Sequence, residues 1–226
     1  AITLTPFGHP LAEKMQAPEP GFLKGVREIA AKHGTVLIFD EIRTGFRLSL
    51  GGAQKYYGVT PDLSCVGKSM ANGYSISAVT GKAEIMKAAE RTVFISSTFF
   101  PNSLSYIASL KTIEILERGN VLDKIWEKGG RFLEKVQNLI NRYDVGAELS
   151  GVAPMFFITF KHDKEKTYKA RREDFFTQLI RRGIFMQVYH HGYIVHRHTE
   201  QDLDIAVRAV DEALAYVYEK HGVVKL

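Results

Sequence analysis

Residues 35–40 read TVLIFD, a short apolar run rich in branched side chains that ends in a carboxylate. Such a run is typical of a strand buried in a parallel sheet. Before it, residues 21–33 place apolar side chains at helical spacing, and Gly34 ends the pattern. Three more elements are predicted further along: strands at residues 62–67 (DLSCVG) and 76–81 (ISAVTG), and an amphipathic helix at residues 103–118. Alternating helices and strands predict an α/β architecture with a mostly parallel sheet.

The pattern changes after Gly119. We predict a long helix over residues 121–143, broken or bent near Gly129 and Gly130, because glycine weakens a helix. Thr199 and Asp202 predict a capped start for a closing helix at residues 200–218. The other predicted elements are strands at 147–149, 155–160 and 193–196 and a helix at 172–182. These elements indicate two domains: residues 1–118, which carry the larger sheet, and residues 119–226, a small α+β domain.

The composition suits a folded protein with a sizeable core, since 45% of the 226 residues are hydrophobic and 24% are charged. The single cysteine, Cys65, excludes an internal disulfide and favours a reducing compartment, for which the cytoplasm is the default. No stretch approaches the roughly 20 apolar residues that cross a bilayer. We therefore expect a soluble cytoplasmic protein without a membrane partner.

The formal charge of +5 raises the question of nucleic-acid binding. The basic residues do not cluster in the way that such binding requires. Arg171-Arg172 and Arg181-Arg182 lie in a segment with helical periodicity and are diluted by Glu173 and Asp174. A solvated helix face is the better interpretation of these arginines. We expect no nucleic-acid partner.

Polar side chains follow two of the predicted strands. Asp40 comes directly after the apolar part of the first run, and Lys68 follows Gly67 at the end of the second. Considered alone, each residue has a structural interpretation. Asp40 would cap the loop that follows the strand, and Lys68 would be a surface lysine. In open α/β sheets, however, ligands gather at the carboxyl ends of the strands.

Together, the two side chains suit one kind of cofactor. A lysine amine can form a Schiff base with an aldehyde, and burial lowers its pKa so that the neutral, nucleophilic form is available. An aspartate against a pyridine nitrogen keeps that nitrogen protonated, so the ring can accept electrons. We therefore predict that Lys68 and Asp40 flank a single aldehyde-bearing heterocycle.

The segments around these two residues resemble the class III aminotransferases, particularly the branch that contains glutamate-1-semialdehyde aminomutase. The resemblance is carried, in register, by Gly21-Phe22-Leu23 through His33-Gly34, by Leu37 through Arg47, by Pro61-Asp62-Leu63, and by Gly67-Lys68 and Gly73. It implies the C-terminal part of a fold type I transferase that binds pyridoxal 5′-phosphate (PLP). Segments 151–160 and 198–202 are also similar to the C-terminal domain of that family.

The resemblance also implies roles for individual residues. Asp40 matches the partner of the pyridine nitrogen, Ile42 the branched residue against one face of the ring, and Lys68 the Schiff-base lysine that also moves the proton. Ser97 and Thr98, followed by Asn102, resemble the segment whose threonine reaches the cofactor phosphate of a neighbouring subunit. Self-association across the PLP site is therefore expected. Phe99-Phe100-Pro101 and Ser103 depart from the glycine and proline usual around that asparagine.

The resemblance covers only the C-terminal half of such enzymes. The other half normally supplies backbone amides for the cofactor phosphate, an aromatic residue that stacks on the ring, and several strands of the large sheet. The chain is then either a fragment of a longer polypeptide or one subunit of a split enzyme. We favour the split enzyme, with a second chain that resembles the N-terminal half as its partner.

The implied reaction is transfer of an amino group between a small amine or amino acid and a keto or aldehyde acceptor. An aminomutase or a racemase would use the same residues, and a non-catalytic partner subunit is a third alternative. His196 and His198 would share a strand face, and His190-His191 lie nearby, but no carboxylate or cysteine stands at ligand spacing. We expect no metal site.

Overall fold

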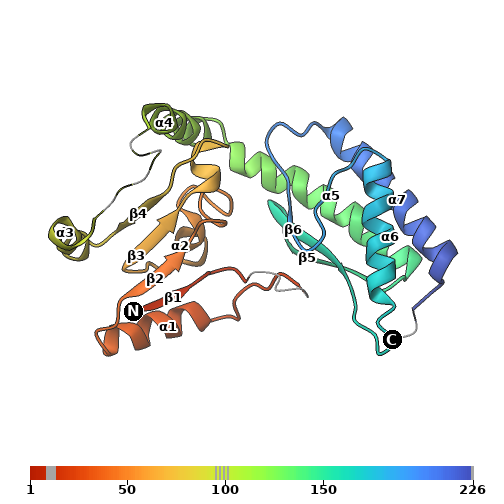
Figure 1. Cartoon of the computed structure of the whole chain (residues 1–226), viewed down its shortest axis with the longest axis horizontal. Helices are drawn as coiled ribbons and strands as arrows, with labels where there is room; N and C mark the ends of the chain where they lie inside the picture. Colours follow the sequence, from red (N-terminus) through yellow and green to blue (C-terminus); the bar gives the residue numbers. More distant parts are fainter. Residues whose placement is uncertain (9–13, 95, 97, 99, 101, 225–226) are drawn as a thin grey trace. The chain divides into compact units, whose positions relative to one another are not determined.

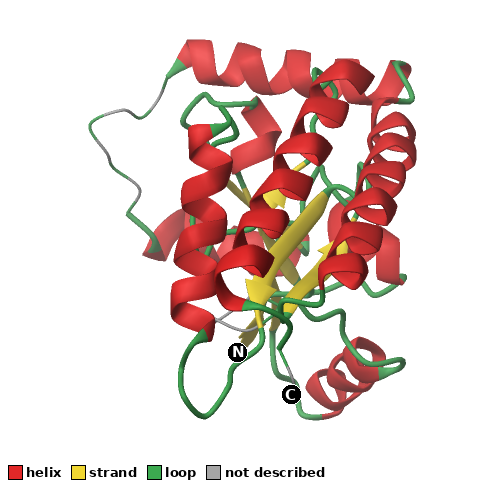
Figure 2. Cartoon of the chain, turned by 90° about the vertical axis from the view of Figure 1, so that its right-hand side faces the viewer, coloured by secondary structure: helices red, strands yellow, loops and turns green. Residues whose placement is uncertain are grey.

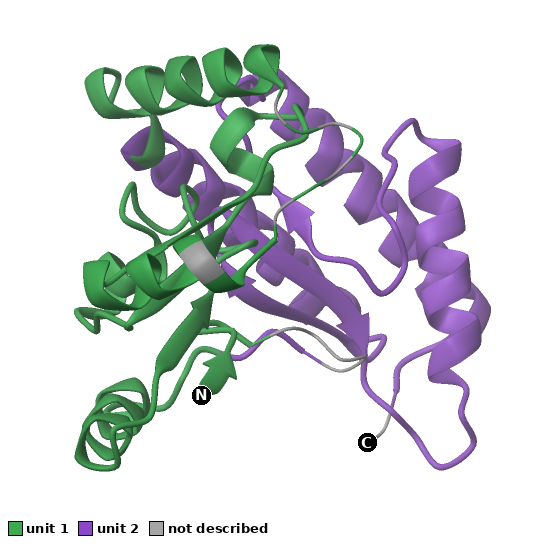
Figure 3. Ribbon diagram, turned by 60° about the vertical axis from the view of Figure 1, so that its left-hand side comes forward, with its two compact units in different colours: residues 1–8, 17–122 green, residues 9–16, 123–226 purple. Residues whose placement is uncertain are grey.

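The computed structural model describes residues 1–8, 14–94, 96, 98, 100 and 102–224. It divides into two compact units, coloured separately in Figure 3. The first unit comprises residues 1–8 and 17–122, and the second comprises residues 9–16 and 123–226.

The first unit is built on a four-stranded sheet in the order β1-β2-β3-β4 (Figure 1). Its strands are β1 (Ile2–Leu4), β2 (Leu37–Asp40), β3 (Leu63–Val66) and β4 (Ala78–Gly81). Its helices are α1 (Phe22–Lys32), α2 (Gly52–Tyr57), the 3₁₀-helix η1 (Lys68–Ala71), α3 (Ala83–Thr92) and α4 (Ser103–Arg118). The first three strands are mutually parallel, and β4 runs antiparallel to β3. The predicted α/β architecture is confirmed, and the sheet is mixed.

The core of the first unit lies between β2 and α1. Leu37 and Phe39 point to one side of the strand and are fully buried, where they pack with Leu23 and Ala30 of α1. Side chains alternate across a strand, so Ile38 and Asp40 point to the opposite side, and both are only half-buried. The strand predicted to be buried is therefore well covered on one face and partly open on the other.

Asp62 ties the elements of this unit together at the start of β3. Its buried carboxylate accepts hydrogen bonds from the Leu37 amide of β2 at 2.7 Å and from Arg27 of α1 at 2.8 Å, and Lys82 beyond β4 lies 2.8 Å away. Burial opposes ionisation, but these hydrogen bonds and the Arg27 charge hold the pKa of Asp62 well below its usual range. The carboxylate thus stabilises the fold while it is ionised.

Replacing Asp62 by asparagine is expected to lower the free energy of unfolding by about 3 kcal/mol at pH 7, because it leaves two cations without their buried partner. The folded-state pKa lies below the unfolded value, so the contribution is complete above the unfolded pKa, begins to decrease below it, and is lost only as the pH falls through the folded-state pKa. Urea unfolding of both proteins at pH 7 and pH 3 measures this. A wild-type advantage that is equally large at both pH values would contradict the assignment.

The second unit is an antiparallel three-stranded sheet, ordered β5-β6-β7, with helices on one side (Figure 2). Its strands are β5 (Ala147–Val152), β6 (Met155–Phe160) and β7 (Gly192–Tyr193). Its helices are α5 (Val121–Tyr143), α6 (Tyr168–Arg181) and α7 (Glu200–His221). Every residue of the central strand β6 is buried. β7 is shorter than the predicted strand at 193–196, because only Gly192 and Tyr193 pair with β6.

Helix α5 runs without interruption through Gly129 and Gly130, so the predicted break is wrong. A Cβ atom at Gly129 would lie 2.6 Å from the backbone oxygen of Ala153. Glycine at this position therefore permits close approach of the helix to the β5–β6 turn.

Arg171 and Arg172 are buried, so the predicted solvated face is wrong for this pair, whereas Arg181 is exposed as predicted. Arg171 donates to Asp163 at 3.1 Å and also bonds to Thr167, and Arg172 stacks 4.0 Å from the centre of the Tyr189 ring. Burial of Asp163 opposes ionisation, but hydrogen bonds from the residues that begin α6 and the Arg171 charge lower its pKa to about 2. Both arginines are thus part of the internal structure of the second unit.

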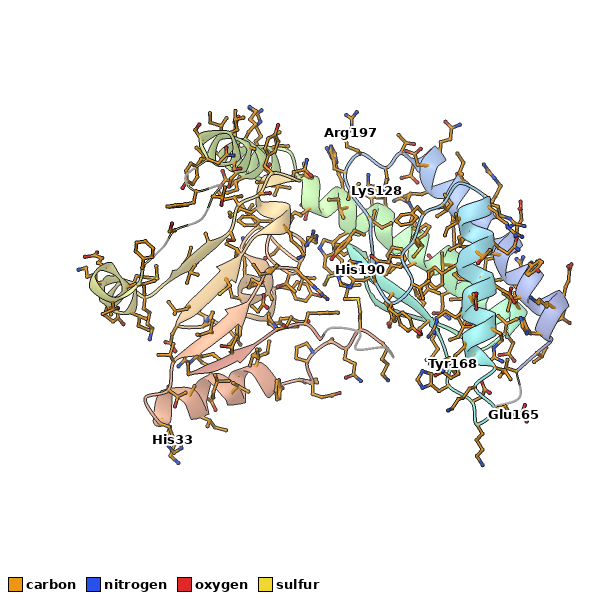
Figure 4. The ribbon with its side chains drawn as sticks, viewed as in Figure 1. His33, Lys128, Glu165, Tyr168, His190 and Arg197 are labelled. Carbon is orange, nitrogen blue, oxygen red and sulfur yellow. The ribbon has the colours of Figure 1, made fainter. Side chains whose placement is uncertain are left out.

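The loop before α7 is fixed at both ends. The Thr199 hydroxyl accepts from the Asp202 amide, and the Asp202 carboxylate accepts from the Thr199 amide, which confirms the predicted cap as a full capping box. Lys128 of α5 donates to the backbone oxygens of His196 and His198 at 2.7 and 2.6 Å. Figure 4 shows Lys128 beneath this loop.

Within the described ranges, none of the helices combines the length and the apolar composition that a membrane span requires.

Candidate cofactor site

The ends of β2 and β3 bring the two predicted cofactor residues to one edge of the sheet (Figure 1). The strands are parallel and pair Asp40 with Cys65, and the Glu41 amide extends the pairing by donating to the Cys65 oxygen at 2.9 Å. Lys68 follows Cys65 by three residues along the chain. Both residues therefore lie at the carboxyl edge of the sheet, which is where α/β folds bind ligands.

The Asp40 carboxylate is half-buried and oriented by its own loop. One of its oxygens, Oδ1, accepts a hydrogen bond from the Ile42 amide at 3.1 Å. Among the described residues, none donates a hydrogen bond to Oδ2. Burial, and then the negative charge of Asp40, raise the pKa of the Cys65 thiol. One carboxylate oxygen is thus fixed by the backbone, and the other is available to a ligand.

Ile42 lies over the backbone that leads to Lys68. A Cβ atom at Gly67 would lie 3.3 Å from Cδ1 of Ile42 and 3.3 Å from the backbone oxygen of Ile76. A larger side chain at residue 67 would therefore press on Ile42. Because Gly67 has no side chain, Ile42 can pack close to the backbone that immediately precedes Lys68.

Lys68 begins the 3₁₀-helix η1 with a left-handed backbone, at φ 46°. Such a conformation is uncommon and costly for a residue with a side chain, and functional sites are enriched in it. The turn is held to the loop after β2 by Ser69, whose hydroxyl donates to the Gly45 oxygen at 2.7 Å. The Lys68 side chain is exposed among the described residues of this chain.

Glu41 is a residue of this site that sequence reasoning missed. Its carboxylate is fully buried and accepts hydrogen bonds from the Thr44 hydroxyl at 2.6 Å and from the amides of Ala53 and Gln54 at 2.7 and 2.9 Å. Those two amides belong to the first turn of α2. The loop after β2 orients Asp40. Through these hydrogen bonds, Glu41 anchors that loop to α2, which begins more than ten residues further along the chain.

Replacing Glu41 by glutamine is expected to lower the free energy of unfolding by about 2 kcal/mol, because an amide NH₂ cannot accept from the donors that surround it. Chemical unfolding of the two proteins measures the difference. The matched control is Glu28→Gln, since Glu28 is exposed on α1 and reaches Lys24 only at 4.0 Å. An equal decrease in the free energy of unfolding of the two variants would contradict the proposed role of Glu41 in holding the loop.

The segment predicted to reach a neighbouring subunit is only partly described. Ser97 lies outside the described residues, and Thr98 is exposed in a turn. Asn102 has a clear local role, because its side chain accepts from the amides of Leu104 and Ser105 at 3.0 and 3.3 Å and so caps α4. The contact of Thr98 with a cofactor phosphate stays a prediction.

No group of three or more His, Cys, Asp or Glu side chains in the described part of the chain is arranged to hold a metal ion. His190 and His191 instead stack on each other, with ring centres 4.4 Å apart.

A family profile described as "Aminotransferase class-III" matches residues 14–207. The chain belongs to this family. It is 52% identical over 216 residues to 3-aminobutyryl-CoA aminotransferase of Cloacimonas acidaminovorans (strain Evry), covering 96% of this chain and 52% of the relative. It is 34% identical over 207 residues to glutamate-1-semialdehyde 2,1-aminomutase of Archaeoglobus fulgidus, covering 87% and 50%. The resemblance noted from the sequence is thereby confirmed.

Solved structures of PLP-binding and transaminase proteins share the fold. The PLP internal aldimine form of the FumI protein from Sphingopyxis sp. MTA144 superposes with a TM-score of 0.89 at 25% identity, over 99% of this chain and 53% of that one. An omega-transaminase from Sphaerobacter thermophilus gives 0.85 at 27% identity, over 96% and 52%. The chain therefore has the fold of about half of a PLP-dependent transaminase. The chain spans about half the length of the relatives it matches.

Proposed function

We propose that this chain is the lysine-bearing half of a PLP-dependent class III aminotransferase. One observation carries the proposal: in a member of this family, adjacent parallel strands deliver Asp40 and Lys68 to the same edge of the sheet. Pyridoxal phosphate is the cofactor that the family and its PLP-bound solved relative indicate. When bound, it supplies an aldehyde that bonds to an amine and a ring that accepts electrons.

The residues at the sheet edge fit such a group. The free oxygen of Asp40 would hold a proton on the ring nitrogen, while the Ile42 amide keeps the carboxylate in place. Ile42 would pack on one face of the ring, and the left-handed turn at Lys68 would direct the amine toward it. Lys68 would be both the covalent anchor and the group that moves the substrate proton. Ser97 and Thr98 would contact the phosphate from a second subunit.

The complete enzyme needs the other half of the fold. The exposed Lys68 and the half-open face of β2 both support a missing cover. We use "assembled enzyme" for this chain together with a polypeptide that resembles the N-terminal half of the family, and we favour a separate partner chain in the cytoplasm. Self-association of this assembly across the PLP site completes the proposal.

For the substrate, the 52% identity to a 3-aminobutyryl-CoA aminotransferase favours the coenzyme A thioester of a short 3-amino acid as the amino donor, with a keto acid as acceptor. The 34% identity to aminomutases supports intramolecular transfer as the second candidate. An assay with each donor, with and without a keto acid, separates them, because only the aminotransferase requires an acceptor.

The site assignment is tested by covalent trapping. The chain is co-expressed with the first half of the Cloacimonas acidaminovorans relative, incubated with PLP and reduced with borohydride, and its peptides are mapped by mass spectrometry. A pyridoxyl group on the Lys68 peptide is expected. An adduct on another lysine, or none in an assembly that contains both halves, would refute the proposal.

A further inference from the structure

The segment that connects β6 to α6 and begins that helix carries almost all of the net charge of the chain. Residues 161–172 contain six lysines and arginines against two acidic residues, a net charge of +4, whereas the whole chain has +5. The rest of the chain is therefore close to neutral. We call residues 161–169 the basic loop, and two of its residues, Tyr168 and Glu165, are labelled in Figure 4.

The two arginines of this segment add little to its outer surface. Arg171 and Arg172 are buried, and Arg171 pairs with Asp163. The Asp163 carboxylate also accepts hydrogen bonds from the amides of Thr167 and Tyr168 at 2.9 and 2.8 Å, so both of its oxygens are engaged within the unit. The charges that remain at the surface belong to lysines and to one glutamate.

Four exposed lysines dominate the outer surface of the basic loop, beside the exposed Glu165. None of the four forms an ion pair with a carboxylate of the described residues. Like charges held close together repel one another, and a bound anion removes that repulsion. Lysine is also a common partner of phosphate groups. The four residues are Lys161, Lys164, Lys166 and Lys169.

An aromatic pair lies among these lysines. The rings of His162 and Tyr168 stack, with centres 4.1 Å apart and planes 25° apart. Tyr168 is half-buried and is held by the buried Arg172, whose guanidinium lies 5.6 Å from the centre of the Tyr168 ring. His162 is exposed, so its ring offers a face to solvent on a fixed support. Such a ring is a surface on which a nucleobase can stack.

We propose that the basic loop binds the nucleotide end of a coenzyme A thioester, with the adenine stacked on His162 and the phosphates beside the lysines. This inference rests on the proposed function, in which such a thioester is the amino donor. A purine that carries several phosphates uses both features of the loop, because the aromatic stack suits a flat base and the lysines suit a polyanion. A long flexible arm joins the nucleotide to the thioester, so the nucleotide does not need to bind at the edge of the sheet.

The two contacts differ in their dependence on salt. Exposed ammonium groups attract phosphates through water, so their contribution decreases as the ionic strength rises. Stacking of the base on a ring depends little on salt. The loop therefore predicts an affinity for coenzyme A that decreases with added salt to a limit set by the stack.

The test is isothermal titration calorimetry of free coenzyme A with the 226-residue chain, without PLP or a partner chain. His162→Ala is expected to weaken binding about tenfold through loss of the stack. Lys164→Glu/Lys169→Glu is expected to weaken binding by a similar factor at low salt and to make it less sensitive to salt. The matched control, Lys87→Glu/Lys124→Glu, makes the same change of charge at exposed lysines of α3 and α5 and should bind as the wild type does.

Far-UV circular dichroism checks that each variant keeps its helices. Wild-type affinity in both variants of the basic loop would overturn the proposal, as would a wild-type chain that does not bind coenzyme A. Pantetheine, which lacks the nucleotide, should not compete with coenzyme A, and equal competition by it would place recognition on the arm and also overturn the proposal. ATP that binds more tightly than coenzyme A would assign the loop to a free nucleotide, with the same consequence.

This binding requires neither cofactor nor turnover, so it is independent of the trapping experiment. Coenzyme A binding that depends on the basic loop, without a pyridoxyl group on Lys68, would refute the proposed function and leave the nucleotide site standing. A pyridoxyl group on Lys68 in a chain that does not bind coenzyme A would leave the aminotransferase standing and refute the nucleotide site.

Discussion

Replacing Lys68 by alanine is expected to lower the rate of amino transfer by the assembled enzyme by about 10⁴-fold or more. The side chain has two tasks in the proposed reaction, covalent attachment and proton transfer, and alanine performs neither. Its exposure and its position at the first residue of η1 mean that no core contact is lost. The measurement is single-turnover transfer to a keto acid, together with the visible absorbance of the lysine-bound cofactor.

Two matched variants separate chemistry from charge. Lys68→Arg keeps a cation but cannot act as a nucleophile at neutral pH, so it should be as inactive as the alanine variant. Lys87→Ala removes an exposed lysine from the neighbouring helix α3 and should retain full activity. Substantial transfer by Lys68→Ala would show that this chain is a non-catalytic subunit, or that another residue carries the reaction.

Much of the scaffold could be predicted from the sequence because its signals are local. Branched apolar runs predict β2 and β3, and the helix predicted at residues 103–118 has the bounds of α4. The predicted strand at 155–160 likewise has the bounds of β6. The positions of Asp40 and Lys68 follow from these strands, since a residue at the end of a parallel strand lies at the edge of the sheet whatever surrounds it.

Other features depend on contacts between distant segments. β1 is only three residues long and forms by pairing with β2. α2 has a glycine at its start, and its first turn is capped by Glu41, which lies more than ten residues earlier. The sequence pattern of residues 83–92 likewise does not lead to a predicted helix, although these residues form α3. The sequence alone does not predict β1 or α2, because each depends on a contact with a segment that is distant along the chain.

The buried arginines show the same limit for charged residues. Sequence patterns assign arginine to the surface by default, because most arginines lie there. Arg171 can be buried because it pairs with Asp163, and Arg172 because it stacks on the Tyr189 ring. Helix α4 is a further case, because it buries Ser105 and Ser109 and exposes leucines. Its sequence is amphipathic, so a helix is predicted correctly, but which side faces the rest of the unit is decided by the close approach to η1.

Replacing Asp40 by asparagine is expected to lower the rate of amino transfer by about 10²–10³-fold, because asparagine can accept the Ile42 amide but carries no charge to hold a proton on the ring nitrogen. Asp40→Glu keeps the charge and should lose less. Both rates are measured in the assembled enzyme at saturating PLP, so that weaker cofactor binding does not enter.

A second readout of the Asp40 change requires no turnover. The Asp40 charge contributes to the raised pKa of the Cys65 thiol, after burial. Removing the charge should therefore lower that pKa, so the thiolate forms at a lower pH and Cys65 is alkylated faster at a fixed pH. Cys65 is the single cysteine of the chain, so its peptide reports the rate directly. An unchanged alkylation profile would contradict a contribution of the Asp40 charge to the pKa of the thiol.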